Sequence, residues 1–167
     1  MRHTVTRFVL IAGVVSAFVL AAAPDTRAQS ASPFVGTWVL DLDRSAFTPA
    51  EFAPDAKTVA LEMVGNQLKQ MSRTTRGTGR NPVNEVTYTV GFDGNEVTIP
   101  ASGVRIMLKR IDDNTFERMA RGDRGQMETS RWTVSSDRTT LTVTTEGSDA
   151  FGDKYSSTQV FTLDTGD

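Results

Sequence analysis

Apolar and polar residues alternate with a period of two along most of the chain after about residue 35. Val59, Leu61 and Met63 fall on one side of such a segment, and Thr58 and Glu62 fall on the other. Successive side chains of a β-strand point to opposite faces, so this period predicts strands with one buried face. Valine and threonine, which are typical of strands, are abundant. The pattern therefore predicts an all-β domain.

The alternation predicts about ten strands separated by short turns. They cover residues 35–42, 58–63, 67–75, 86–92, 96–99, 104–109, 115–120, 126–134, 139–145 and 155–163. The pairs Gly65-Asn66 and Asp93-Gly94 suit tight hairpins, so we expect each of them to join two paired strands. Residues 43–55 contain two prolines and leave room for one short helix.

Short connections make strands that follow one another in sequence antiparallel neighbours in space. Twist and exposed edges favour closure of so long a meander. We therefore predict an antiparallel up-and-down β-barrel of roughly eight to ten strands. A two-sheet sandwich is the structural alternative, but its Greek-key crossings need longer connections than these turns provide.

The N-terminal segment has the three parts of a secretory signal peptide. Arg2 and Arg7 give a basic start, residues 8–23 are apolar and uncharged, and a short polar stretch follows. We expect residues 1–28 to be removed by a cut between Ala28 and Gln29, which leaves one domain over residues 29–167. This predicts a periplasmic or secreted protein without a stable membrane span after cleavage. An uncleaved membrane anchor is the alternative, although the apolar run is shorter than the ~20 residues that a spanning helix needs.

Composition narrows the chemistry. The chain has no cysteine, and its one histidine, His3, leaves with the predicted signal peptide. Nucleophilic triads and the usual zinc, copper and haem sites are disfavoured without these residues, so we predict no catalytic residue, metal site or cofactor. The signal peptide carries three arginines and one aspartate, and its removal shifts the net charge from −2 to −4. This acidic balance argues against nucleic acid as a partner, and we expect a monomer.

Four basic residues on the predicted strands have two interpretations. They are Arg105, Lys109, Arg118 and Arg131. If the apolar faces of their strands pack inward, these side chains are surface charges that pair across strands. If the interior is polar, one or two of them meet an anionic ligand. The surface interpretation is the favoured one.

Three further arginines cluster in and beside a glycine- and threonine-rich loop. Arg73, Arg76 and Arg80 are spaced closely enough to hold an anion or a lipid head group. A solvated loop is the simpler interpretation, because the domain carries a net negative charge.

The start of the predicted domain resembles that of the calycin superfamily. Phe34 to Asp41 contains Gly36-Thr37-Trp38, similar to the Gly-x-Trp element of lipocalins and to the first strand of fatty-acid-binding proteins. The later spacing Tyr88 to Gly94, with Tyr-x-x-x-x-Asp-Gly, is similar to that of small secreted bacterial lipocalin-like proteins. The resemblance spans nearly the whole predicted domain and implies a barrel that binds a small ligand.

The chain departs from the fatty-acid-binding pattern in two places. Residues 43–55 are too few for the two helices that this family has after its first strand. The last predicted strand, with residues 157–161 reading Ser-Thr-Gln-Val-Phe, lacks the Arg-x-Tyr pair with which that family holds a carboxylate. We therefore do not transfer that carboxylate site to this chain.

The leading hypothesis is non-covalent binding or carriage of a small, mostly apolar or amphipathic ligand inside the barrel. The candidate lining residues are Trp38, Leu61, Tyr88, Val90, Ile106, Phe116 and Trp132. One alternative is a filled barrel that serves as a structural or interaction module of the cell envelope. Another is an isomerase or cyclase, which would need a carboxylate with a raised pKa inside the cavity.

Overall fold

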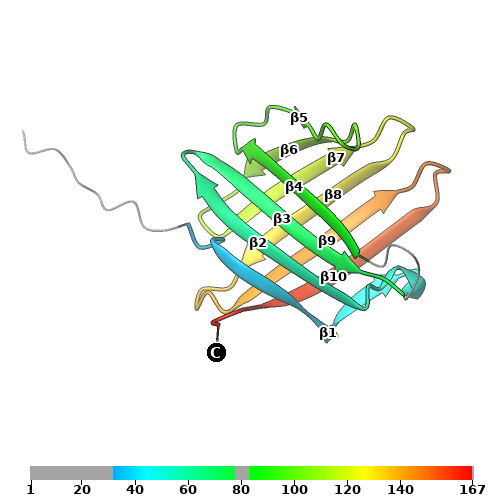
Figure 1. The fold of residues 1–167 in the computed structure, drawn as a ribbon. Helices are drawn as coiled ribbons and strands as arrows, with labels where there is room; N and C mark the ends of the chain where they lie inside the picture. Colours follow the sequence, from blue (N-terminus) through cyan, green and yellow to red (C-terminus); the bar gives the residue numbers. More distant parts are fainter. Residues whose placement is uncertain (1–31, 78–82, 167) are drawn as a thin grey trace, which may run out of the picture. The chain divides into compact units, whose positions relative to one another are not determined.

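The computed structural model describes residues 32–77 and 83–166 (Figure 1). The predicted signal peptide lies outside these residues, and its cleavage stays a prediction. Within the described residues no helix is long and apolar enough to cross a membrane.

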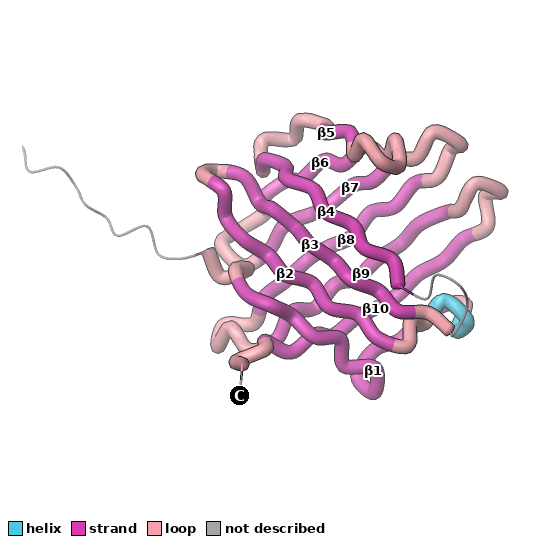
Figure 2. The backbone as a smooth tube through the Cα atoms, viewed as in Figure 1, coloured by secondary structure: helices cyan, strands magenta, loops and turns pink. Residues whose placement is uncertain are grey.

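Ten strands and one 3₁₀ turn make up the described chain, so the predicted all-β class is confirmed (Figure 2). They are β1 (Gly36–Thr48), η1 (Ala50–Phe52), β2 (Ala56–Val64), β3 (Gln67–Thr75), β4 (Val83–Gly91), β5 (Val97–Thr98), β6 (Arg105–Arg110), β7 (Thr115–Arg121), β8 (Met127–Val134), β9 (Thr140–Ser148) and β10 (Lys154–Leu163). The short η1 turn lies where the sequence left room for a helix.

All ten strands belong to one antiparallel sheet with the order β4-β3-β2-β1-β10-β9-β8-β7-β6-β5. The first and last strands pair, with Trp38 opposite Leu163 and Leu40 opposite Phe161. This pairing wraps the sheet so that β1–β4 lie across β6–β10 (Figure 1). The result is the predicted barrel, closed everywhere except between β4 and β5.

Of the two predicted hairpins, one is confirmed and one is wrong. Gly65-Asn66 joins β2 to β3, and the left-handed φ of Gly65, 58°, suits the turn. Asp93-Gly94 does not turn the chain back onto β4, because β5 pairs with β6 instead. Asp93 forms a bridge to Lys109, and the Gly94 amide donates a hydrogen bond of 3.1 Å to a β6 carbonyl. These contacts draw the segment toward β6 and leave the barrel unpaired at this place.

Most of the largest buried side chains come from strand positions that face the barrel interior, and Phe34 joins them from the turn before β1. Trp38 is fully buried, and its indole Nε1 donates a hydrogen bond of 2.9 Å to the Phe34 carbonyl. Phe116 stacks on Trp132 with ring centroids 5.4 Å apart and meets Phe34 edge to face at 4.9 Å. Each such side chain stabilises the fold by ~1.5–3 kcal/mol through burial, and the aromatic geometry adds to this.

Candidate functional site

The interior changes from apolar to polar along several of the strands that cross it. On β10 the inward positions run from Phe161 through Gln159 and Ser157 to Tyr155. The neighbouring strands follow the same order, because Leu141 lies opposite Phe161 and Thr145 lies opposite Ser157. One end of the barrel is therefore a packed apolar core, and the other end carries polar side chains.

A layer of hydrogen-bonded polar groups separates these two halves. The Tyr88 hydroxyl donates a hydrogen bond of 2.6 Å to Gln70 Oε1, and both residues are buried. The Trp132 Nε1 donates to the buried Ser130 Oγ at 2.9 Å. Burial raises the pKa of Tyr88, so its hydroxyl stays protonated and can donate. The layer satisfies the polar tips of two aromatic side chains whose rings belong to the core.

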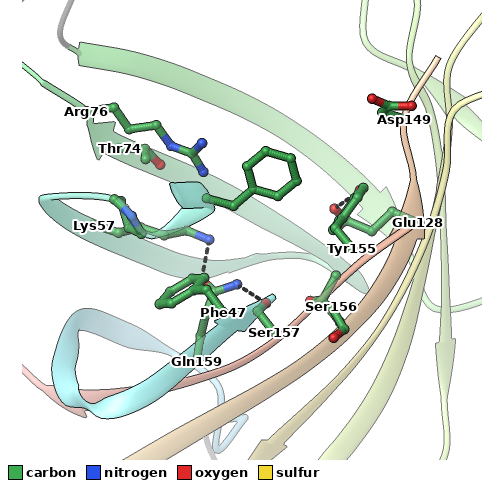
Figure 3. A pocket seen from close by; sticks show the side chains of 13 residues that line it. Phe47, Lys57, Thr74, Arg76, Glu128, Asp149, Tyr155, Ser156, Ser157 and Gln159 are labelled. Carbon is green, nitrogen blue, oxygen red and sulfur yellow. Dashed lines mark hydrogen bonds between the residues drawn. The ribbon is translucent and has the colours of Figure 1, made fainter. Parts of the chain in front are cut away.

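A cavity of about 320 Å³ occupies the polar end. Its apolar wall consists of Phe47, Phe52 and Pro54, which come from the end of β1 and from the η1 segment. Polar side chains from β2, β3, β8, β9 and β10 and from the segments that follow β3 and β9 line the rest, with Lys57 and Gln159 in direct contact (Figure 3). The cavity thus has the mixed lining that suits an amphipathic molecule, and its volume lies at the lower end of the ~300–1,000 Å³ typical of ligand sites.

Lys57 places a partly buried amino group at this cavity. Its Nζ donates a hydrogen bond of 2.8 Å to Gln159 Oε1, and Gln159 in turn donates from Nε2 to Ser157 Oγ at 3.0 Å. The Phe161 ring lies below, with its centroid 5.7 Å from Nζ. None of the ion pairs among the described residues includes Lys57. Burial, and then the charge of Arg118, lowers the pKa of Lys57 to about 8.

Arg118 and Glu128 form an ion pair inside the barrel beside this lysine. Arg118 Nη1 donates to Glu128 Oε1, and the Tyr155 hydroxyl donates to Glu128 Oε2 at 2.9 Å. The two charged side chains are only 17% and 27% exposed. Burial opposes ionisation of Glu128, but the charge and hydrogen bonds of Arg118 outweigh it and lower the pKa of the carboxyl.

This group of charges is not balanced. Lys57 and Arg118 bring two positive charges, and Glu128 brings one negative charge. Arg118 Nε is also buried without a hydrogen-bond partner among the described residues. A fourth charged group, the exposed Arg76 on the cavity wall, adds a further cation, which Asp149 on the opposite wall offsets. The floor of the cavity therefore favours an anion.

An isomerase or cyclase would need a carboxylate that lies in the cavity and has a raised pKa, and the structure meets only the first of these two requirements. Glu128 lines the cavity, as that hypothesis requires, but its pKa is lowered rather than raised. An ionised carboxylate bound to Arg118 is a poor proton donor at neutral pH. Among the described residues no group of three or more histidine, cysteine, aspartate or glutamate side chains is placed to hold a metal.

The seven predicted lining residues all point into the barrel and belong to one buried cluster. They are Trp38, Leu61, Tyr88, Val90, Ile106, Phe116 and Trp132, and none is more than 7% exposed. None of them lines the cavity, because they fill the apolar end below the polar layer. Contact between these residues and a ligand stays a prediction.

Apart from Arg76, sequence reasoning missed the residues that line the cavity. Lys57 lies one residue before the predicted strand 58–63, but it shares a strand face with Val59 and Leu61. Glu128 is likewise in phase with Trp132 on β8. The sequence signal for this site is a charged residue that alternates onto the same strand face as buried apolar residues.

Of the four basic strand residues, three lie on the surface and one lies in the interior. Arg105, Lys109 and Arg131 are exposed, and Arg131 donates to Glu117 on the adjacent strand at 2.7 Å. The predicted surface position is therefore confirmed for these three, and the predicted pairing across strands is confirmed for Arg131. The surface interpretation is wrong for Arg118, whose position on β7 is in phase with Phe116 and which is held inside by Glu128.

The three arginines at and after the end of β3 also differ in their surroundings. Arg73 is exposed and pairs with Glu85 on β4 at 3.7 Å. Arg76 lines the cavity. Arg80 lies outside the described residues. Only Arg76 therefore joins the candidate site.

A second hollow of about 550 Å³ lies beside the ends of β8, β9 and β10. It includes Thr129, Glu146 and Lys154, which alternate with the inward positions and so belong to the outer face. Glu146 and Lys154 are exposed. Without a buried polar group, this surface offers weaker grounds for ligand binding than the interior cavity does.

Comparisons with known proteins identify the fold. No protein-family model and no curated protein matches the chain. Among solved structures, As-p18, an extracellular fatty acid binding protein, matches with a TM-score of 0.55 at 13% identity over 80% of this chain and 98% of that one. The fold is a calycin-like β-barrel. This confirms the fold that the resemblance of Gly36-Thr37-Trp38 implied.

Two further solved structures match with a TM-score of 0.46 each. One is a zebrafish ileal bile acid-binding protein complexed with cholic acid, at 11% identity over 80% of this chain and 100% of that one. The other is a bovine odorant binding protein complexed with its natural ligand, at 15% identity over 83% and 76%.

Proposed function

We propose that the barrel binds a small amphipathic ligand non-covalently, with an anionic head group at Lys57 and an apolar tail against Phe47 and Phe52. The observation that carries this proposal is the cavity at the polar end, whose floor holds an amino group with no carboxylate partner in the part of the chain that the structure describes. Burying a cation is costly unless an anion or several hydrogen-bond acceptors compensate it. A bound carboxylate supplies that compensation.

The proposal modifies the hypothesis of a mostly apolar ligand. The apolar half of the interior is occupied by packed side chains such as Phe116 and Trp132, whereas the cavity wall is partly polar. A compact ligand with one charged end matches this wall better than a long hydrocarbon does. The match to an extracellular fatty acid binding protein in fold agrees with a binding role but does not select the ligand.

We also propose that the protein acts outside the cytoplasm as a monomer. The basic, apolar and polar order of residues 1–28 supports export. N-terminal sequencing of protein recovered from the host envelope tests the cut before Gln29. An N-terminus other than Gln29 would contradict the proposed cleavage. Size-exclusion chromatography with light scattering tests the monomer.

Calorimetric titration with octanoate and with the neutral analogue 1-octanol tests the binding proposal. A charge-assisted hydrogen bond is worth about 1.5–3 kcal/mol, so octanoate should bind at least about tenfold more tightly at pH 7. Lys57→Met should remove this preference, and the matched surface variant Lys109→Met should retain it. Equal affinities for both ligands in the wild-type protein, or no binding of either, would overturn the proposal.

A further inference from the structure

The surroundings of the Lys57 amino group leave it free to react. Among the described residues its one hydrogen bond goes to Gln159 Oε1, and none of their carboxylates forms an ion pair with it. The amide of Gln159 is fixed from its other end by Ser157 Oγ, so the acceptor holds the amine in one place. Figure 3 shows the Lys57 amino group directed into the cavity between Arg76 and Gln159. An amine that donates one N–H to an acceptor keeps its lone pair available when it is neutral.

We infer that Lys57 forms a reversible imine with small amphipathic aldehydes that enter the cavity. The amine lone pair attacks the carbonyl carbon, a C–N bond forms, and the carbonyl oxygen takes up a proton while the nitrogen releases one. Loss of water from this carbinolamine gives the C=N bond. The net change is amine plus aldehyde to imine plus water, so no oxidant, reductant or further reactant is needed.

One neighbouring hydroxyl suits the first stage of this reaction. The Ser157 hydroxyl lines the same cavity, and because its oxygen accepts from Gln159 Nε2, its own proton can be donated to a carbonyl oxygen at the reacting end of a ligand. The Tyr155 hydroxyl also lines the cavity, but its proton is donated to Glu128 Oε2. Burial raises the pKa of Tyr155, so its hydroxyl keeps its proton. Glu128, also on the cavity wall, is already paired with Arg118, and at Lys57 the charge of Arg118 outweighs that of Glu128, so these surroundings favour the neutral imine over its protonated form.

The pKa of Lys57 makes the neutral amine accessible. With a pKa of about 8 instead of the ordinary 10.5, about a tenth of the amine is neutral at pH 7, compared with less than a thousandth for a surface lysine. A less basic amine is also a weaker nucleophile, which offsets part of this gain. We expect Lys57 to react about tenfold faster than a surface lysine.

This inference rests on the cavity of the proposed function but concerns a second class of ligand. The proposed function needs Lys57 as a cation that attracts a carboxylate. Imine formation needs the neutral amine and an aldehyde. The two can therefore succeed or fail separately, and the experiment measures both on the same protein.

Reductive trapping tests the inference. The purified protein is incubated with octanal and sodium cyanoborohydride across a pH range, and peptide mapping follows the alkylation of each of the four lysines. Lys57 should be alkylated about tenfold faster than Lys69, Lys109 and Lys154 at pH 7. Its rate should level off above pH 8, whereas the rates at the surface lysines should continue to rise.

Two variants provide the controls. Lys57→Arg should lower the total alkylation at pH 7 to that of the surface amines, and Lys109→Arg should leave labelling at position 57 unchanged. Uniform alkylation of all four lysines in the wild-type protein would overturn the inference, even if octanoate binds as proposed. Selective labelling of Lys57 in a protein that does not bind octanoate would support the inference and overturn the proposed function.

Discussion

Replacing Arg118 by methionine tests the charged floor of the cavity. The substitution removes the guanidinium that donates to Glu128 and leaves that carboxylate with only the Tyr155 hydroxyl among its described partners. Breaking a fully buried ion pair costs about 3–5 kcal/mol, and partial exposure of these two side chains, 17% and 27%, lowers the expected cost to about 2–3 kcal/mol. Urea unfolding at pH 7 measures this change in the free energy of unfolding.

The pH dependence of this loss of stability distinguishes the removal of an ion pair from the removal of packing contacts. In the wild-type protein the pKa of Glu128 is lowered, so its contribution to stability is full above the ordinary value of 4.5 and disappears as the pH falls through the lower folded value. In Arg118→Met, burial dominates and raises the pKa of Glu128. The variant should therefore approach the wild-type stability as the pH falls from 7 toward 4.5.

A double variant completes the test. Arg118→Met combined with Glu128→Leu removes both charges, and it should be more stable than Arg118→Met alone because no unpaired carboxylate remains. A loss below about 0.5 kcal/mol for Arg118→Met, or a loss that does not change with pH, would refute the placement of this pair inside the barrel.

Three further predictions concern the core, the packing around the site and the cavity wall. Trp38→Ala should lower the free energy of unfolding by about 3–5 kcal/mol, whereas the exposed neighbour Val39→Ala should change it by less than about 0.5 kcal/mol in the same urea titration. Gly147→Ala should displace the phenol of Tyr155 and shift the Met127 carbonyl, which both occupy the space that a Cβ would need, and cost at least about 1–2 kcal/mol; the further change Tyr155→Phe should then add nothing, and a full additional loss would contradict this. Phe47→Ser should weaken octanoate binding about fivefold in calorimetry by removing apolar wall, but an equal loss for the short butyrate would show a general disruption instead.

Local pattern was enough to predict the barrel. The alternation around Val59 and Leu61, and the place of Trp38 in the first strand, identified inward faces that the structure confirms. The gap after β4 was not predictable in this way. Asp93-Gly94 has the chemistry of a hairpin turn, but its direction depends on contacts with residues of β6 farther along the chain. Turn residues determine the local backbone conformation, but they do not determine which strand the following segment pairs with.

The site was harder to predict than the fold because its charges are compensated by distant residues. Lys57 meets Gln159, which is 102 positions away, and Glu128 receives the Tyr155 hydroxyl from another strand. Viewed alone, a lysine or arginine on a strand is most often exposed, and this held for Arg131. Arg118 differs only because its inward phase coincides with a carboxylate on the neighbouring strand.

A nuclear magnetic resonance titration of the lysine side chains tests the central claim most directly. The four lysines give few enough signals to follow the Lys57 ammonium individually, with and without saturating octanoate. Lys57 should titrate near pH 8 in the free protein, and its pKa should rise by about one unit or more when octanoate binds, because a carboxylate favours the charged amine. A Lys57 pKa near 10.5 that octanoate leaves unchanged would contradict the account.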